Sequence, residues 1–233
     1  MQRAIIEKND AMIVNWSQNW LSARDKRIIW IDCEMTGLRR KDKIIEIACV
    51  IVGEQIDIVV HQPENVLADM KVWHKNTFAA NGLLDSIRSN RISRISIKEA
   101  EKQVLFFCAN AKLDLFYFYI FSQFSQFFCQ ILNHLTKYTR KGKCPLAGNS
   151  VSVDRMFINR EMQNLAAHLH YRTIDVASFN EIVKRWYPEK YASMPAKSGK
   201  HRALDGILES IQELTWYCRN VFAETEIPVQ FLL

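Results

Sequence analysis

Asp32 and Glu34, within IIWIDCEMTG (28–37), are the first residues whose spacing suggests chemistry. They continue an apolar run, and because successive side chains of a strand point to opposite sides, both carboxylates project from one face. Two partly desolvated carboxylates repel each other, and a bound cation removes that repulsion. Ligands that are all oxygen suit magnesium or manganese. The alternative is an edge strand whose acids simply face solvent.

The elements that must position these acids alternate between strand and helix. Strand-like runs occupy 27–34, 44–52 and 55–60, and shorter ones follow around 145–148 and 170–175. Helical periodicity is found near 97–108, after each of the two later strands, and over roughly 202–222. Three adjacent strands followed by strand–helix units predict an α/β fold, with a mixed sheet and helices on its faces.

Composition limits the classes of protein to which the chain can belong. Its 233 residues are 48% hydrophobic and 24% charged, which predicts one folded domain and excludes wholesale disorder. The net charge of +6 is compatible with a polyanionic partner. The six cysteines form no C-x-x-C pair and sit mostly in apolar runs, a pattern typical of reduced thiols in an intracellular protein.

Two stretches stand outside this alternation. Residues 1–26 form an N-terminal extension that lacks the apolar core of a signal peptide. LDLFYFYIFSQFSQFFCQIL (113–132) has the length of a membrane span, but its aspartate, serines and glutamines disfavour insertion. We expect that segment to be buried or to face a partner, and we expect no membrane association.

Later stretches carry further residues of the same chemical kind. AGNSVSVDRMF (147–157) places Asp154 at a strand-to-helix junction, and SGKHRALDGILES (198–210) places His201 at a helix start. WIDCEMTGL, PLAGNSVSVDRMF, HYRTIDV and HRALDGILES, in that order, closely resemble the oligoribonucleases of the DEDDh exonuclease superfamily. RWYPEKY (185–191) resembles the eukaryotic branch of that family.

The resemblance covers about residues 27–110 and 132–222. It implies a ribonuclease H-like fold, with a mixed five-stranded sheet flanked by helices. We therefore expect an exonuclease domain over 27–222 that carries a phenylalanine-rich insertion at about 111–131. The extension at 1–26 precedes this domain, and a tail at 223–233 follows it.

The resemblance also implies a 3′→5′ exoribonuclease that degrades very short RNA by two-metal phosphodiester hydrolysis. Asp32, Glu34 and Asp154 match three metal ligands, and two Mg²⁺ or Mn²⁺ ions per active site are expected. His201 matches the general base that deprotonates the attacking water, a role suited to histidine near neutral pH. Taken alone, a histidine at a helix start would be interpreted as a capping or packing residue.

Substrate-binding residues follow from the same resemblance. Leu38 and Trp73 match residues beside the terminal base, although each would otherwise be interpreted as a core residue. Ser150 and Arg172 match the pair that grips the 5′ phosphate of a dinucleotide. Tyr171 matches a catalytic residue that is contributed across a homodimer interface. The expected partners are short single-stranded RNA and a second copy of the chain, inside the cell, with cytoplasm, mitochondrion and nucleus all open.

Three positions depart from the family pattern. Phe78 and Ala177 stand where the family has a histidine and a serine that touch the phosphate. The fourth metal-binding aspartate lies five residues after the histidine, where this chain has Gly206. Asp205, four residues after His201, matches a neighbouring acid and is a doubtful ligand. An apolar stripe on the last helix, formed by Leu204, Ile207, Leu208, Ile211 and Leu214, places positions 205 and 206 on opposite sides of it.

Three hypotheses therefore stay open. The chain is an active oligoribonuclease, a catalytically weakened relative that binds short RNA without efficient turnover, or another DEDDh exonuclease that acts on DNA ends or longer RNA. HYRTIDV and AGNS favour the first hypothesis over the third. Only the three departures favour the second.

Overall fold

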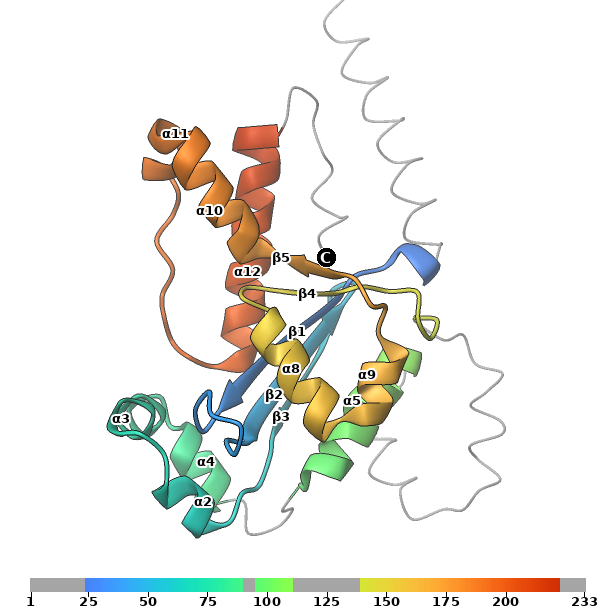
Figure 1. Cartoon of the computed structure of the whole chain (residues 1–233), viewed down its shortest axis with the longest axis vertical. Helices are drawn as coiled ribbons and strands as arrows, with labels where there is room; N and C mark the ends of the chain where they lie inside the picture. Colours follow the sequence, from blue (N-terminus) through green and yellow to red (C-terminus); the bar gives the residue numbers. More distant parts are fainter. Residues whose placement is uncertain (1–23, 90–94, 111–138, 223–233) are drawn as a thin grey trace, which may run out of the picture.

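The computed structural model describes residues 24–89, 95–110 and 139–222. Its sheet contains five strands in the order β3–β2–β1–β4–β5 (Figure 1). Their bounds are Ile29–Met35 (β1), Ile44–Ile51 (β2), Glu54–Val59 (β3), Leu146–Gly148 (β4) and Thr173–Asp175 (β5). The first three strands are antiparallel, whereas β4 is parallel to both β1 and β5. This mixed five-stranded sheet confirms the predicted fold class.

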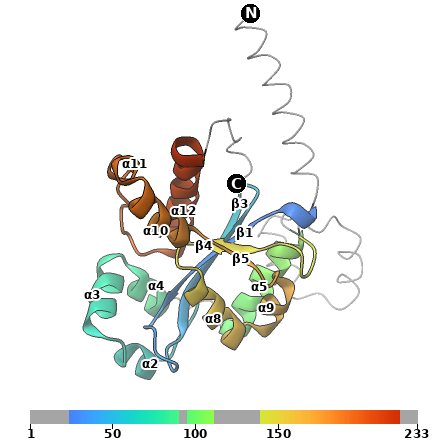
Figure 2. The same cartoon turned by 45° about the horizontal axis from the view of Figure 1, so that its top comes forward.

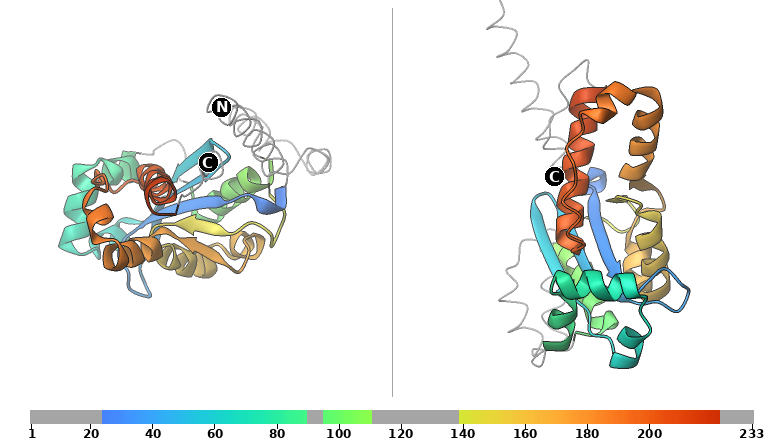
Figure 3. Two further views of the ribbon diagram at one scale, coloured as in Figure 1. Left: turned by 90° about the horizontal axis from the view of Figure 1, so that it is seen from above. Right: turned by 90° about the vertical axis from the view of Figure 1, so that its left-hand side faces the viewer.

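The centre of the sheet is covered on both faces, as Figure 3 shows. All eight residues of β2 are buried, which explains its nearly continuous apolar run. On one face, Ile29 and Ile31 pack in the cluster formed with α5 (Ile97–Asn110), α8 (Ser152–Glu161) and α9 (Gln163–His168). On the other face, Trp30 packs against α12 (Ala203–Tyr217). Strand alternation then places Asp32 and Glu34 on the α12 face.

Three short helices form a separate unit at one end of the sheet (Figure 2). They are α2 (Glu64–Ala68), α3 (Val72–Ala80) and α4 (Leu83–Ser89), and none of them was among the predicted elements. Each has nine residues or fewer, and periodicity over so few turns is a weak signal. Leu67, Phe78 and Leu83 of this unit pack on Ile45 of β2 in a small core of their own.

The remaining elements are η1 (Arg24–Lys26), α10 (Val176–Trp186), α11 (Pro188–Ala192) and η2 (Cys218–Phe222). The predicted helix at 202–222 is observed as α12 followed directly by the π-helical turn η2. Apart from η1, the predicted extension lies outside the described residues, as do the phenylalanine-rich insertion and the tail. Within the described part of the chain, every helix is too short or too polar to cross a bilayer.

Candidate active site

Asp32 and Glu34 lie on β1 where only one side of the strand is paired. β4 pairs with β1 at Ile29 and Trp30 alone, whereas β2 continues beside β1 past Glu34. Both acids are partly buried, and the intervening Cys33 points into the opposite core cluster. The second edge of β1 is therefore available to another element beside the two carboxylates.

Asp154 approaches that edge from the first turn of α8. Its Oδ1 accepts a hydrogen bond of 2.9 Å from the backbone N–H of Cys33, and its side chain is almost fully buried. The approach depends on Gly148 at the end of β4, because a Cβ there would meet the carbonyl oxygen of Ile31 at 2.9 Å. The chain thus passes closely over β1 before α8 begins, and this close passage brings Asp154 to the strand.

Burial and mutual repulsion disfavour the charged form of all three acids. Burial, followed by the charge of Asp154, raises the pKa of Asp32 well above its ordinary value. Burial and then Asp32 raise the pKa of Glu34 to about 8. Burial raises the pKa of Asp154 to about 7, although the hydrogen bond from Cys33 opposes the shift. A divalent cation would relieve this repulsion and favour the ionised carboxylates.

The three carboxylates do not form a preassembled coordination shell. Across residues 24–89, 95–110 and 139–222, no group of three His, Cys, Asp or Glu side chains converges closely enough to hold a metal ion. Their donor chemistry, three carboxylates at one strand edge, nevertheless fits one Mg²⁺ or Mn²⁺ ion. A second ion would lack its expected carboxylate, because position 206 has no side chain.

Gly206 faces Asp32 directly from α12. A Cβ built on Gly206 would lie 2.5 Å from Asp32 Oδ2 and 3.2 Å from Asp32 Cγ, so the carboxylate takes the space of the absent side chain. The predicted apolar stripe was wrong for Leu208, which is 40% exposed, whereas Ala203 and Ser210 are buried. The buried face of α12 is therefore rotated toward those small residues, and Gly206 turns toward the sheet.

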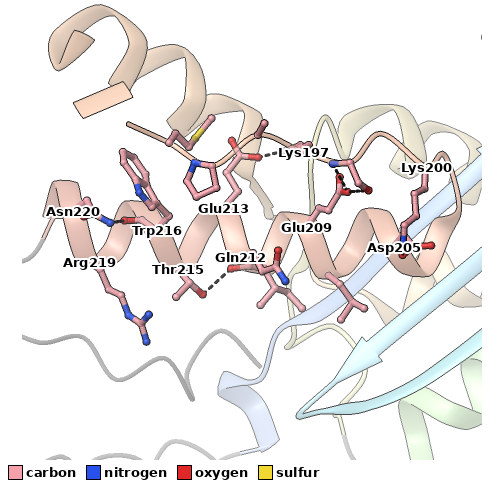
Figure 4. Close-up of a pocket in the computed structure, with 16 residues that line it drawn as sticks. Lys197, Lys200, Asp205, Glu209, Gln212, Glu213, Thr215, Trp216, Arg219 and Asn220 are labelled. Atoms are coloured by element: carbon pink, nitrogen blue, oxygen red, sulfur yellow. Dashed lines mark hydrogen bonds and ion pairs between the residues drawn. The ribbon is translucent and has the colours of Figure 1, made fainter. Parts of the chain in front are cut away.

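Asp205 belongs to a row of acids that holds the segment preceding α12. Figure 4 shows residues 197–200 running beside the helix. A cavity of about 760 Å³ lies between residues 194–200 and α12. The acids are four residues apart on one helix face, and each contacts the segment: Asp205 with Lys200 at 2.9 Å, Glu209 with the N–H of Ser198 at 2.9 Å, and Glu213 with Lys197. Asp205 is thus half-exposed and paired with a lysine.

His201 stands just before α12 and is exposed. Its ring lies edge-on to Trp73, with centroids 5.2 Å apart. The next two residues are anchored by the fully buried Glu46, which accepts hydrogen bonds from Arg202 Nε at 2.8 Å and from the N–H of Ala203 at 2.9 Å. Glu46 was not among the predicted site residues, although it is the single charged residue in IIEIACVIV (44–52).

The residues expected to bind substrate lie at the surface. Leu38 is 65% exposed and Trp73 is 55% exposed, so the interpretation of either as a core residue was wrong. Tyr171 is 74% exposed, and the guanidinium of Arg172 lies over its ring at 5.4 Å. Ser150 is exposed as well, and its N–H donates to Asp175 Oδ1 at 2.9 Å.

Phe78 and Ala177, two of the departures from the family pattern, differ in their surroundings. Phe78 is only 1% exposed and packs within the α2–α4 unit, so it serves the core and offers nothing to a phosphate. Ala177 lies in the first turn of α10, where its N–H donates to Asp175 Oδ1 at 3.0 Å. Neither position supplies a polar side chain.

The chain is similar in sequence to known nucleases. A family model described as Exonuclease matches residues 29–80 and 96–214. The mitochondrial oligoribonuclease of Mus musculus is 36% identical over 84% of this chain and 74% of its own length. The oligoribonuclease of Nocardia farcinica is 39% identical over 88% of this chain and 85% of its own length. A probable oligoribonuclease of Caenorhabditis elegans is 37% identical over 86% of this chain and 92% of its own length.

Proposed function

This chain belongs to the oligoribonuclease family of the DEDDh exonuclease superfamily, and we propose that it hydrolyses short single-stranded RNA from the 3′ end to mononucleotides. It is a nuclease of a family that works with divalent metal ions. The observation that best supports the activity is the gathering of Asp32, Glu34 and Asp154 beside β1, where burial and mutual repulsion raise the pKa of each.

Asp32, Glu34 and Asp154 are the residues that would hold Mg²⁺ or Mn²⁺. A bound cation supplies charge stabilisation for the attacking and leaving oxygens of the phosphodiester. Before a cation binds, the three acids offer a phosphate no positive charge, so RNA binding at this edge of β1 depends on divalent ions. His201 takes the proton of the attacking water, and its exposed position beside Trp73 leaves it accessible to both water and substrate.

The exposed residues around this centre bind the RNA. Leu38 and Trp73 offer apolar surface on which any base can stack, which suits degradation without sequence preference. Ser150 and Arg172 hold the 5′ phosphate of the shortest substrates. Since Phe78 and Ala177 add no polar group, this phosphate has fewer contacts than the family pattern provides, and the preference for dinucleotides is correspondingly modest.

A second copy of the chain completes the proposed enzyme. Tyr171 is 74% exposed on the turn between α9 and β5, so its ring is available to a neighbouring subunit. Light scattering at micromolar concentration should report a dimer, and a purely monomeric chain would contradict this assembly. Cys33, Cys49, Cys108 and Cys218 are free thiols, which supports an intracellular location.

The decisive experiment is turnover of a 5′-labelled diribonucleotide in Mg²⁺ and in Mn²⁺, beside a longer RNA and a DNA dinucleotide. We expect mononucleotide products, with the diribonucleotide cleaved at least as fast as the longer RNA. Binding of the diribonucleotide without turnover would instead support the weakened relative. Cleavage of DNA ends, or of longer RNA alone, would support a different DEDDh exonuclease.

A further inference from the structure

His201 has a backbone conformation that its own sequence does not favour. Its φ angle is 52°, in the left-handed region that residues other than glycine seldom adopt. Such a conformation costs free energy and persists only where the surroundings enforce it. The side chain is exposed, so packing of the imidazole cannot be the main constraint, and the constraint must act on the backbone.

Asn81 supplies contacts of that kind. Its Nδ2 donates to the carbonyl oxygen of His201 at 2.6 Å and to that of Lys200 at 3.0 Å. One amide group therefore fixes both peptide carbonyls around the left-handed residue. Asn81 is separated from His201 by 120 positions in the sequence, so this contact is purely tertiary.

The amide of Asn81 is itself oriented by its own helix junction. Its backbone N–H donates to the carbonyl of Thr77 at 3.0 Å at the end of α3, and its Oδ1 accepts from the N–H of Leu83 at 3.1 Å at the start of α4. Because the Leu83 N–H requires an acceptor, the oxygen faces α4 and the NH₂ group faces residues 200 and 201. The donor is thus aimed by the fold of the α2–α4 unit.

The same unit also contacts the imidazole. Trp73, on α3, lies edge-on to the His201 ring at an interplanar angle of 85°. Phe78, between Trp73 and Asn81 in sequence, anchors this helix in the core shared with Ile45 of β2. Two contacts from α3 and its C-terminal cap therefore reach His201, one on its backbone and one on its ring.

We propose that Asn81 is a positioning residue for His201: its amide holds the backbone of residues 200 and 201 and thereby fixes the place of the imidazole beside Trp73. This inference rests on the proposed function, in which His201 is the general base. Asn81 does not touch the reacting atoms. Its loss would leave RNA binding intact and allow the base to move away from the attacking water.

The test uses Asn81→Asp, which keeps the acceptor for the Leu83 N–H and replaces the donor with a charged oxygen. We expect kcat on a diribonucleotide to fall by about 10- to 100-fold, as small misplacements of a catalytic group do, while KM stays within about two-fold. Asn81→Ser, whose hydroxyl can donate to one of the two carbonyls, should fall between Asn81→Asp and the natural sequence. Asn76→Asp, on the exposed side of α3, controls for the added charge.

His201→Asn is measured in parallel, because it tests the general-base role of His201 separately from the positioning role of Asn81. If His201→Asn keeps full activity, the assignment of His201 as base is wrong, and the positioning role falls with it. If His201→Asn is inactive while Asn81→Asp turns over normally, only the positioning role is wrong. Should Asn81→Asp lose thermal stability as well, Asn81→Ala decides: normal kcat in a stable alanine variant, which has no donor, would overturn the proposal.

Discussion

Asp32 and Glu34 stand on a strand that the sheet itself holds, whereas His201 stands on an exposed segment held by side chains. The register of β1 with β2 fixes the two acids, and a backbone N–H of β1 fixes Asp154. The segment before α12 depends instead on Asn81, on Glu46 and on the row of acids along α12. Isosteric substitutions of Asp32, Glu34 or Asp154 should therefore leave the fold intact. Substitutions in the contacts that hold the segment before α12 should instead change the position of His201.

The largest effect is expected from Asp154→Asn, which tests the carboxylate side. The amide oxygen can still accept the hydrogen bond from Cys33, so the fold should be retained while the ligand charge is lost. Turnover should fall by more than the roughly 100-fold that loss of an outer metal-site partner can cost. Near-normal turnover in a folded Asp154→Asn protein would contradict the assignment of this carboxylate to the cation.

Gly206→Asp sharpens the comparison, because it adds a carboxylate from the α12 side. A Cβ at this position must displace the Asp32 carboxylate, which lies 2.5 Å from it. The effect of the added side-chain volume therefore has to be distinguished from the effect of the added charge. Gly206→Asn is the matched control with the same shape and no charge. We expect Gly206→Asp to bind Mn²⁺ at least ~10-fold more tightly than Gly206→Asn, since an added carboxylate suits a hard cation.

Turnover decides what the Gly206 change means for the natural chain. A gain in kcat for Gly206→Asp over the natural sequence would show that the missing carboxylate limits the enzyme. No gain in either Mn²⁺ affinity or kcat would show that three carboxylates and water already suffice. In that case the catalytically weakened hypothesis loses its main support.

The placement of the acids was readable from sequence, and the orientation of α12 was not. Strand alternation put Asp32 and Glu34 on one face, and the small-residue turn placed Asp154 at the start of a helix. The stripe on α12 was drawn from large apolar residues alone, but the helix packs through Ala203 and Ser210 as well. Small residues carry little hydrophobic signal, so the apolar periodicity could not predict the rotation that turns Gly206 toward Asp32, although the family resemblance places position 206 at the metal.

Long-range polar contacts were equally invisible in the sequence. Asn81 lies in a stretch, 61–96, where no element was predicted, and its contact with His201 exists only once α3 and α4 have folded. Glu46 gave a signal as a lone acid in an apolar strand, but its partners Arg202 and Ala203 depend on how α12 docks. Sequence patterns report burial and periodicity, whereas these contacts depend on tertiary geometry.

A smaller effect is expected on stability as the pH changes. The pKa of Glu34 is raised to about 8 and that of Asp154 to about 7, both above ordinary carboxyl values near 4. Between the unfolded pKa near 4 and the folded pKa of about 7 to 8, the folded state retains protons that the unfolded state has released, so stability is lost progressively as the pH rises through this range. In EDTA, the Tm should fall by a few degrees or more between about pH 5 and pH 8 and should level off at higher pH.

Divalent cations should abolish that fall, because they stabilise the ionised carboxylates in the folded state. Glu34→Gln, which removes one titrating group, should flatten the Tm profile in EDTA without added cation. A Tm that is independent of pH in EDTA would show that burial and repulsion do not shift these acids as described. A fall that persists at saturating Mg²⁺ would mean that other groups cause it.

The smallest effect is expected from Asp205→Asn, which isolates the neighbour of Gly206. Asp205 pairs with Lys200 at 2.9 Å, but the two side chains are 37% and 61% exposed, and a pair of that kind contributes at most about 1 kcal/mol. Two further acids of the row still hold the segment, and one of them, Glu213, is buried and also accepts from Asn149 Nδ2 and Tyr217 Oη. Mn²⁺ affinity should therefore be unchanged and kcat should stay within about two-fold, whereas Glu213→Gln, in the same row, should lower the Tm measurably. If Asp205→Asn instead weakened Mn²⁺ binding as much as Asp154→Asn does, Asp205 would be a ligand, and the segment before α12 would have to rearrange when the cation binds.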